Sequence, residues 1–250
     1  MIHSFLLIGQ SNMAGRGYIE EAVDIDTSRI WVLRNGRWQR HYRPVNCDRP
    51  FSGVCLAESF AAEYAKEFNV DVGLIPCADG GTQLDQWQVG SILYDNAVSQ
   101  ARLAMRTSCL AGILWHQGEG DCGENLYTTY ERRFKPVLDG FRNDLAAHDV
   151  PFLIGGLGDF LPDCPHDKKL INSHHLNDVF KQIANNNERV GYVPANGLTA
   201  NPDQLHFNAA SLHEFGLRYF EVFKKHVDPN KIFKETDQND ITKRTSMEAL

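Results

Sequence analysis

The sequence predicts an α/β fold with a central parallel sheet of about five strands. Two observations support this prediction. Short apolar runs alternate with longer stretches in which apolar residues recur every three or four positions, a pattern typical of β-α-β units. In addition, the first three apolar runs each lead directly into a polar or glycine-rich segment, as strands do at the ligand-binding edge of a parallel sheet.

Five apolar runs are expected to form the strands. They span residues 5–8, 70–75, 113–115, 152–154 and, more weakly, 192–193. Stretches with helical periodicity lie between and after them, at about 54–68, 92–103, 126–141, 171–183 and 212–223. Ser52 stands where it could cap the first of these helices.

One segment, from about residue 16 to residue 51, departs from this alternation. Its two short apolar runs flank Asn35-Gly36, a pair that favours a two-residue hairpin turn. Because the segment joins the first strand to the first helix, at the carboxyl edge of the sheet, we expect a loop or flap bordering the ligand site. We expect one domain over residues 1–235, followed by a polar tail at 236–250, with no internal repeat.

The bulk properties limit the partners of the protein. A chain of 250 residues can bury a large core without disulfides, and its composition is that of an ordinary globular protein. The net charge of −7 argues against a nucleic-acid partner, which requires a basic surface. The N-terminal apolar run is too short, and lacks a basic leader, for a signal peptide or membrane span. We therefore expect a cytoplasmic protein that binds neither nucleic acid nor membrane.

Neither the cysteines nor the histidines indicate a metal site. The six cysteines contain no Cys-x-x-Cys pair, which is typical of free, mostly buried thiols in a protein of this kind. His174 and His175 are adjacent, and neighbouring residues on a helix point in different directions, so they do not easily share one ion. We expect no metal and no cofactor.

The residues that follow the first three predicted strands carry the candidate chemistry. Ser11 follows the first strand, Gly80-Gly81 follows the second, and Gln117 and Glu119 follow the third. Because the carboxyl ends of parallel strands meet at one edge, these segments are expected to line one crevice. Glycine permits close backbone approach, so the Gly80-Gly81 N–H groups and the Gln117 amide could donate to a developing oxyanion.

A base for Ser11 is suggested by the spacing of two later residues. Among the ten histidines, His206 is the best candidate, because Asp203 precedes it by three residues and one loop can hold both. Asp203 would accept from one ring nitrogen while the other faces Ser11, as in a Ser-His-Asp triad. The G-x-S-x-G elbow of ordinary α/β-hydrolases is absent around Ser11.

Four segments of the chain resemble one family. They read GQSNMAG at 9–15, GGT at 80–82, HQGE at 116–119 and DQLH at 203–206. In this order they are similar to the characteristic blocks of the SGNH-hydrolase carbohydrate esterases, which include sialate O-acetylesterase and acetylxylan esterase. The blocks span most of the chain, and together they are far more specific than any one of them.

The resemblance implies a three-layer, flavodoxin-like fold and metal-free hydrolysis of O-acetyl esters on a sugar or oligosaccharide. It assigns Ser11 as nucleophile, His206 as base and Asp203 as the acid that orients the base. The N–H groups of Ser11 and Gly80 and the side chain of Gln117 would form the oxyanion hole. The wider superfamily usually has asparagine in place of Gln117, whereas the carbohydrate-esterase branch shares the glutamine.

Several alternatives stay open at this stage. Glu119 belongs to the same expected crevice and competes with Asp203 for the acid role. Ser11, Gln117 and Glu119 could instead cap helices. Gly80-Gly81 could serve only a tight turn. At the level of function, the rivals are a lipid esterase or thioesterase on the same fold and a non-catalytic carbohydrate-binding protein.

Overall fold

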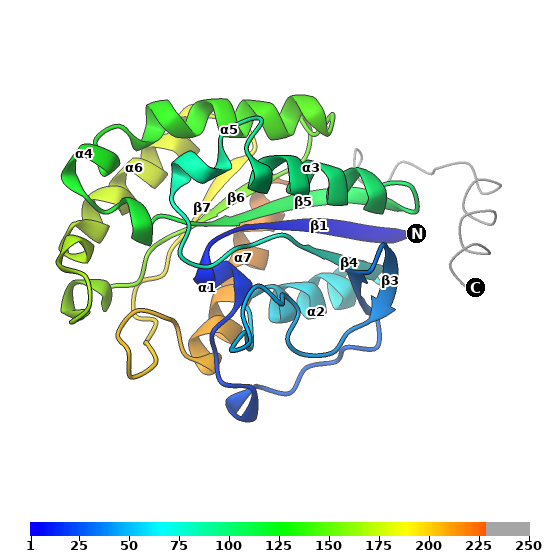
Figure 1. Ribbon diagram of the computed structural model, residues 1–250. Helices are drawn as coiled ribbons and strands as arrows, with labels where there is room; N and C mark the ends of the chain where they lie inside the picture. Colours follow the sequence, from blue (N-terminus) through cyan, green and yellow to red (C-terminus); the bar gives the residue numbers. More distant parts are fainter. Residues whose placement is uncertain (229–250) are drawn as a thin grey trace.

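The computed structural model describes residues 1–228, in which the strands form one seven-stranded sheet (Figure 1). Their spatial order is β3-β2-β4-β1-β5-β6-β7. Neighbouring strands are parallel except for β2 and β3, which form an antiparallel hairpin. The predicted tail at 236–250 lies outside the described residues. The strand bounds are Ile2–Gly9 (β1), Ile30–Arg34 (β2), Arg37–Arg40 (β3), Asp71–Pro76 (β4), Ser108–His116 (β5), Phe152–Gly155 (β6) and Val190–Val193 (β7).

The five strands predicted from the sequence are all present, and β2 and β3 are additional. The hairpin itself does not form the predicted loop or flap bordering the site, because β2 pairs with β4 and lengthens the sheet. The two ends of the predicted segment, at residues 16–20 and at Phe51, do border the site, since they line a cavity that His206 also lines. Ile30 and Val32 are fully buried, and the Trp38 ring packs over Gly73 of β4. Burial of these apolar side chains favours the edge of the sheet over an exposed position at the ligand-binding edge.

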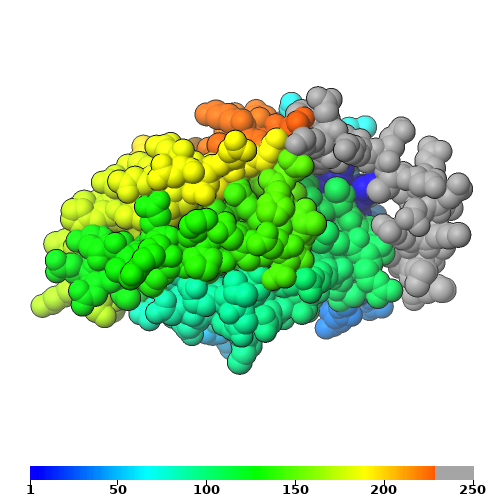
Figure 2. Space-filling model, turned by 90° about the horizontal axis from the view of Figure 1, so that it is seen from above, coloured from blue at the N-terminus to red at the C-terminus, as the bar shows by residue number. Residues whose placement is uncertain are grey.

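Helices cover both faces of the sheet and give the three layers that the family resemblance implied (Figure 1). Figure 2 shows the face covered by α3, α5 and α6, where segments coloured green to yellow form a continuous surface. Each helix within residues 1–228 is too short or too polar to span a membrane. The helices of this face are α3 (Ile92–Ala104), α5 (Tyr130–Asp144) and α6 (Ser173–Asn186), and those of the other face are α2 (Ala57–Phe68) and α7 (Ala209–His226).

Aromatic contacts fix the helices to the sheet on both faces. On one side, Trp115 of β5 meets Phe134 of α5 edge to face, with ring centroids 5.3 Å apart. On the other, Phe5 of β1 meets Phe60 of α2 at 4.8 Å and Phe223 of α7 at 5.7 Å. These contacts hold the strands, and hence the loops at their carboxyl ends, in place.

Two helix boundaries differ from the prediction. The first long helix begins at Ala57 with Leu56 at its N-cap, so Ser52 lies too far ahead to cap it, and the Ser52 hydroxyl accepts from Arg49 N–H instead. The stretch expected as one helix over 126–141 is divided into α4 (Glu124–Tyr127) and α5, with a break at residues 128–129.

Candidate active site

The candidate site lies at the carboxyl ends of the three middle strands, β4, β1 and β5. Backbone hydrogen bonds bring the segments that follow these strands together. Gln10 N–H donates to the His116 carbonyl (2.8 Å), and Asp79 N–H donates to the Gly9 carbonyl (3.0 Å). The three polar segments therefore share one edge of the sheet, as the strand pattern predicted.

Ser11 is the first residue of α1 (Ser11–Ala14), a one-turn helix directly after β1. The N-cap position of this helix is occupied by Gln10 rather than Ser11, and the Ser11 Oγ atom lies 3.0 Å from Nε2 of His206. The tight connection before it depends on Gly9, whose φ of +129° and contact with the His116 carbonyl leave no room for a Cβ atom. The structure therefore turns Ser11 toward a histidine rather than toward its own helix.

His206 and Asp203 share the loop that precedes α7. The ring Nδ1 lies 2.6 Å from Asp203 Oδ2, while Asp203 Oδ1 accepts from the N–H groups of Leu205 (2.9 Å) and His206 (3.0 Å). Burial raises the pKa of Asp203, but hydrogen bonds from the His206 backbone and ring and from the Leu205 backbone outweigh it and lower that pKa. Asp203 is thus an ionised group that orients the ring with Nε2 toward Ser11.

Glu119, the competing candidate for the acid, is buried and has other partners. Its Oε1 accepts from Asn12 Nδ2 (2.6 Å) and lies 3.7 Å from Nδ1 of His116. Its Oε2 has no hydrogen-bond partner among the residues the structure describes. Of the two carboxylates, Asp203 is the one within hydrogen-bond distance of His206.

Asn12, which no sequence argument singled out, links the two halves of the site. Its Nδ2 donates to Glu119 and to the Leu205 carbonyl (3.2 Å), and its Oδ1 accepts from Phe207 N–H (3.0 Å). Asn12 therefore ties the helix that begins at Ser11 to the loop that carries His206. The available signal was its position next to the serine, inside the block at 9–15.

Two of the three expected oxyanion donors are engaged within the protein. Gly80 N–H donates to Asp48 Oδ2 (2.8 Å). The Gln117 side chain is fully buried, and its Nε2 donates to Asp121 Oδ2 (2.7 Å) and to two further oxygen atoms (3.1 and 3.3 Å). Ser11 N–H, by contrast, has no acceptor among the hydrogen bonds found within residues 1–228.

Asp48 forms a buried ion pair with Arg16 in the same corner of the site. Arg16 donates to both carboxylate oxygens (2.7 and 3.1 Å), and the Ser52 hydroxyl donates to one of them (2.7 Å). Burial raises the pKa of Asp48, but the hydrogen bonds from Arg16 and Ser52 and the guanidinium charge lower it to about 2. A Cβ atom on Gly80 would overlap Arg16 and lie 3.4 Å from the Ser11 Cβ atom. No sequence pattern indicates this pair, since its members are 32 residues apart.

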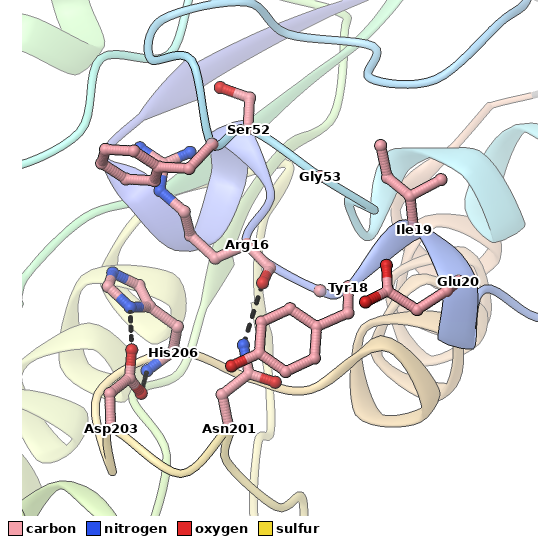
Figure 3. Close-up of a pocket in the computed structure, with 11 residues that line it drawn as sticks. Arg16, Tyr18, Ile19, Glu20, Ser52, Gly53, Asn201, Asp203 and His206 are labelled. Atoms are coloured by element: carbon pink, nitrogen blue, oxygen red, sulfur yellow. Dashed lines mark hydrogen bonds and ion pairs between the residues drawn. The ribbon is translucent and has the colours of Figure 1, made fainter.

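A cavity of about 370 Å³ opens beside His206. Its wall combines residues from the segments that follow α1, precede α2 and precede α7. In Figure 3, His206 and Asp203 lie at the left of the cavity, and Ile19 and Glu20 lie at the right. The cavity therefore adjoins the pair of Asp203 and His206 and forms part of the same candidate site.

In the described chain, histidines, cysteines and carboxylates are not placed together to bind a metal ion. Within residues 1–228, no group of three or more such side chains could hold a metal ion. The rings of His174 and His175 lie side by side, with centroids 3.9 Å apart, so the prediction that these neighbouring side chains point in different directions is wrong. The six cysteines are free and four of them are buried, as their spacing predicted.

Residues 1–225 match the family described as carbohydrate esterase, sialic acid-specific acetylesterase. The chain belongs to this family. A "probable carbohydrate esterase" from Arabidopsis thaliana is 26% identical to this esterase over 250 residues, covering 88% of this chain and 89% of the relative. A "probable 9-O-acetyl-N-acetylneuraminic acid deacetylase" from Escherichia coli K12 is 23% identical over 145 residues, covering 46% of this chain and 44% of the relative.

Structural similarity agrees with the sequence match. A solved structure of a protein from Arabidopsis thaliana superposes with a TM-score of 0.78 at 23% identity, covering 90% of this chain and 99% of that one. The fold is the α/β class that the sequence predicted, with seven strands in place of about five. The chain is a carboxylic ester hydrolase, and its resemblance to the SGNH-type carbohydrate esterases is confirmed.

Proposed function

We propose that this esterase removes acetyl groups from a small sugar or oligosaccharide through an acetyl-enzyme intermediate on Ser11. Two short contacts carry the proposal: Ser11 Oγ to His206 Nε2 (3.0 Å), and His206 Nδ1 to Asp203 Oδ2 (2.6 Å). A nucleophile, a base within hydrogen-bond reach and a carboxylate that orients the base are the parts that acyl transfer requires. Membership of a carbohydrate esterase family supports the substrate class.

In the first half-reaction, His206 Nε2 takes the proton of Ser11 as Oγ bonds to the acetyl carbonyl carbon. The carbonyl electron pair moves to its oxygen and gives an oxyanion, while Asp203 stabilises the imidazolium and stays ionised. When the oxyanion collapses, the bond between the acetyl carbon and the sugar oxygen breaks. The sugar leaves with the proton from His206, and the acetyl group remains on Ser11.

Water repeats the sequence in the second half-reaction. His206 takes a proton from water as the water oxygen bonds to the acetyl carbon. The bond from that carbon to Ser11 Oγ then breaks, and the proton on Nε2 passes to Oγ. Acetate leaves, and Ser11 and His206 return to their starting states.

For the oxyanion, we assign Ser11 N–H as the donor that is available in this conformation. Gly80 N–H donates to Asp48 Oδ2. It can donate to an oxyanion only if it shares its hydrogen between the two acceptors or breaks the bond to Asp48. Gln117 is buried with three acceptors, which suits it to hold the segment after β5 rather than to face the substrate. A single preorganised donor contributes about 3 kcal/mol of transition-state stabilisation.

The test measures acetate release from an acetylated xylo-oligosaccharide and from ethyl acetate. Ser11→Ala should keep the thermal unfolding midpoint of the wild type and lose about 10⁴-fold or more in kcat. Ser99→Ala, which removes an exposed hydroxyl on α3, is the matched control and should leave kcat unchanged.

Three results would contradict the proposal. Activity of Ser11→Ala at the wild-type level would remove the nucleophile assignment. Faster hydrolysis of esters with longer acyl chains would favour a lipid esterase or thioesterase. Sugar binding in a calorimeter without release of acetate would favour a non-catalytic carbohydrate-binding protein.

A further inference from the structure

We propose that the cavity beside His206 binds the sugar of the substrate and that this sugar is uncharged. The inference rests on the proposed function and names the substrate class that this function leaves open. His206 returns a proton to the sugar oxygen as it leaves, so the sugar must lie next to His206. His206 is also part of the cavity wall, which places the cavity on the side of the leaving group.

The size and the rim of the cavity suit a single sugar ring. Its volume of about 370 Å³ lies within the range of small-molecule sites, about 300–1,000 Å³. Tyr18, Ile19 and Phe51 belong to its wall, yet these residues are 44%, 45% and 69% exposed. Apolar side chains left exposed around a hollow mark a ligand site, and aromatic rings can pack on the C–H face of a sugar.

Two buried polar atoms in the wall lack partners. Asn201 is 4% exposed, and its Nδ2 donates to the Arg16 carbonyl (2.9 Å), but its Oδ1 has no hydrogen-bond partner within residues 1–228. The Nε atom of Arg16 is likewise unpartnered in that part of the chain. A buried donor or acceptor without a partner is unfavourable. Both atoms are covered by the surrounding chain, so a sugar hydroxyl can donate to Asn201 Oδ1 or accept from Arg16 Nε only if the wall shifts when the sugar binds.

The charges of the wall disfavour an acidic sugar. Arg16 supplies the guanidinium group of the wall, and this group is already paired with Asp48 through two hydrogen bonds, of 2.7 and 3.1 Å. The other charged groups in the wall are the carboxylates of Glu20 and Asp203. A sugar carboxylate would meet no unpaired cation there and would be repelled by Glu20, whereas a neutral sugar avoids this repulsion.

The first experiment varies the charge of the substrate and of the wall. It compares kcat/KM for O-acetylated N-acetylneuraminic acid with kcat/KM for the same sugar carrying a carboxamide in place of the carboxylate. The wild type should prefer the carboxamide by about threefold or more, and Glu20→Gln should reduce that preference toward one. Glu21→Gln is the matched control, because Glu21 is also exposed and follows Glu20 in the same turn but lies outside the wall. A wild-type preference for the carboxylate form would overturn the inference.

The second experiment tests the cavity itself with acetylated methyl xyloside and ethyl acetate. Tyr18→Ala should lower kcat/KM for the xyloside about tenfold, mainly through KM, and should lower kcat/KM for ethyl acetate by a much smaller factor, because ethyl acetate carries no sugar. Tyr18→Phe, which keeps the ring, should restore most of the loss.

If ethyl acetate is hydrolysed but the Tyr18 and Glu20 variants leave all sugar kinetics unchanged, the esterase proposal stands and the sugar site is wrong. If the wild type hydrolyses none of these esters, the proposed function fails and this inference fails with it.

Discussion

Two carboxylates of the site are held in opposite ways. The Asp203 side chain is 39% exposed, and its partner His206 is three residues away in the same loop. The Asp48 side chain is 3% exposed, and its partner Arg16 is 32 residues away, on the other side of the hairpin in the sequence. Hydrogen bonds lower the pKa of both carboxyl groups, so both are ionised. The two groups differ instead in how deeply they are buried and in how far along the chain their partners lie.

This difference predicts different consequences of losing each carboxylate. Asp203 orients a base from a partly solvated position, so its loss should reduce activity far more than stability. Asp48 compensates a buried guanidinium and also accepts from Gly80 N–H, so its loss should first reduce stability. We therefore expect the partly solvated pair of Asp203 and His206 to act in catalysis, and the buried pair of Asp48 and Arg16 to stabilise the wall around Ser11.

The largest effect is expected from Asp203→Asn. The change leaves the ring of His206 without a carboxylate to fix its tautomer, and kcat should fall about 10⁴-fold. The free energy of unfolding, measured with urea, should change by only about 1 kcal/mol. Glu119→Gln is the comparison, with a loss in kcat of about tenfold or less expected, because Glu119 acts through Asn12. Equal losses in the two variants would mean that the acid has been misassigned.

Asp48→Asn should have the next largest effect, on stability. The substitution leaves the Arg16 guanidinium buried without its counter-charge, which costs about 3–5 kcal/mol in the free energy of unfolding. Urea denaturation followed by circular dichroism measures the loss. The double variant Arg16→Met/Asp48→Leu removes both charges and should recover most of it. A double variant no more stable than Asp48→Asn would show that the ion pair is not the cause.

The stability that the Asp48 carboxylate contributes should depend on pH. The pKa of Asp48 is about 2 in the folded protein, below its ordinary value of 3.8, so the unfolded chain takes up the proton first as pH falls. The stabilisation by this carboxylate is therefore complete above about pH 4 and is lost as pH falls toward about 2. The gap in unfolding free energy between wild type and Asp48→Asn should be constant from pH 7 to pH 5 and smaller at pH 3. A gap that is unchanged at pH 3 would contradict the lowered pKa.

The smallest effects are expected from two neighbouring glycines. A Cβ atom on Gly80 would overlap the Arg16 guanidinium and lie 2.9 Å from Asp48 Oδ2, so Gly80→Ala should cost about 1–3 kcal/mol and reduce kcat. Gly81 has open space around it and a φ of +80°, so Gly81→Ala should cost only about 1 kcal/mol of backbone strain. Unfolding and acetate release measured on both variants separate the two causes. A larger loss in Gly81→Ala would mean that turn strain, not the ion pair, dominates this corner.

Several features of the site were predictable because their signals are local. Ser11 directly follows an apolar strand, and Asp203 and His206 are three residues apart, so short stretches of sequence were enough to propose the contact between them. The oxyanion donors were harder, because a glycine in a motif does not reveal whether its N–H is occupied. Gly80 N–H is occupied by Asp48, which reaches it from a distant segment. The hairpin shows the same limit, since Asn35-Gly36 predicted the turn but not that Trp38 would pack over Gly73.

By itself, the sequence determined the order of the five main strands and of the long helices, and the loop that pairs Asp203 with His206. Hydrophobic periodicity and short-range hydrogen bonds depend on a few neighbouring residues, which a sequence displays. Only the tertiary structure decided that Arg16 meets Asp48 and that a cavity forms beside His206. Those contacts join segments that are far apart in the chain, and their positions follow from the packing of helices and strands throughout the fold.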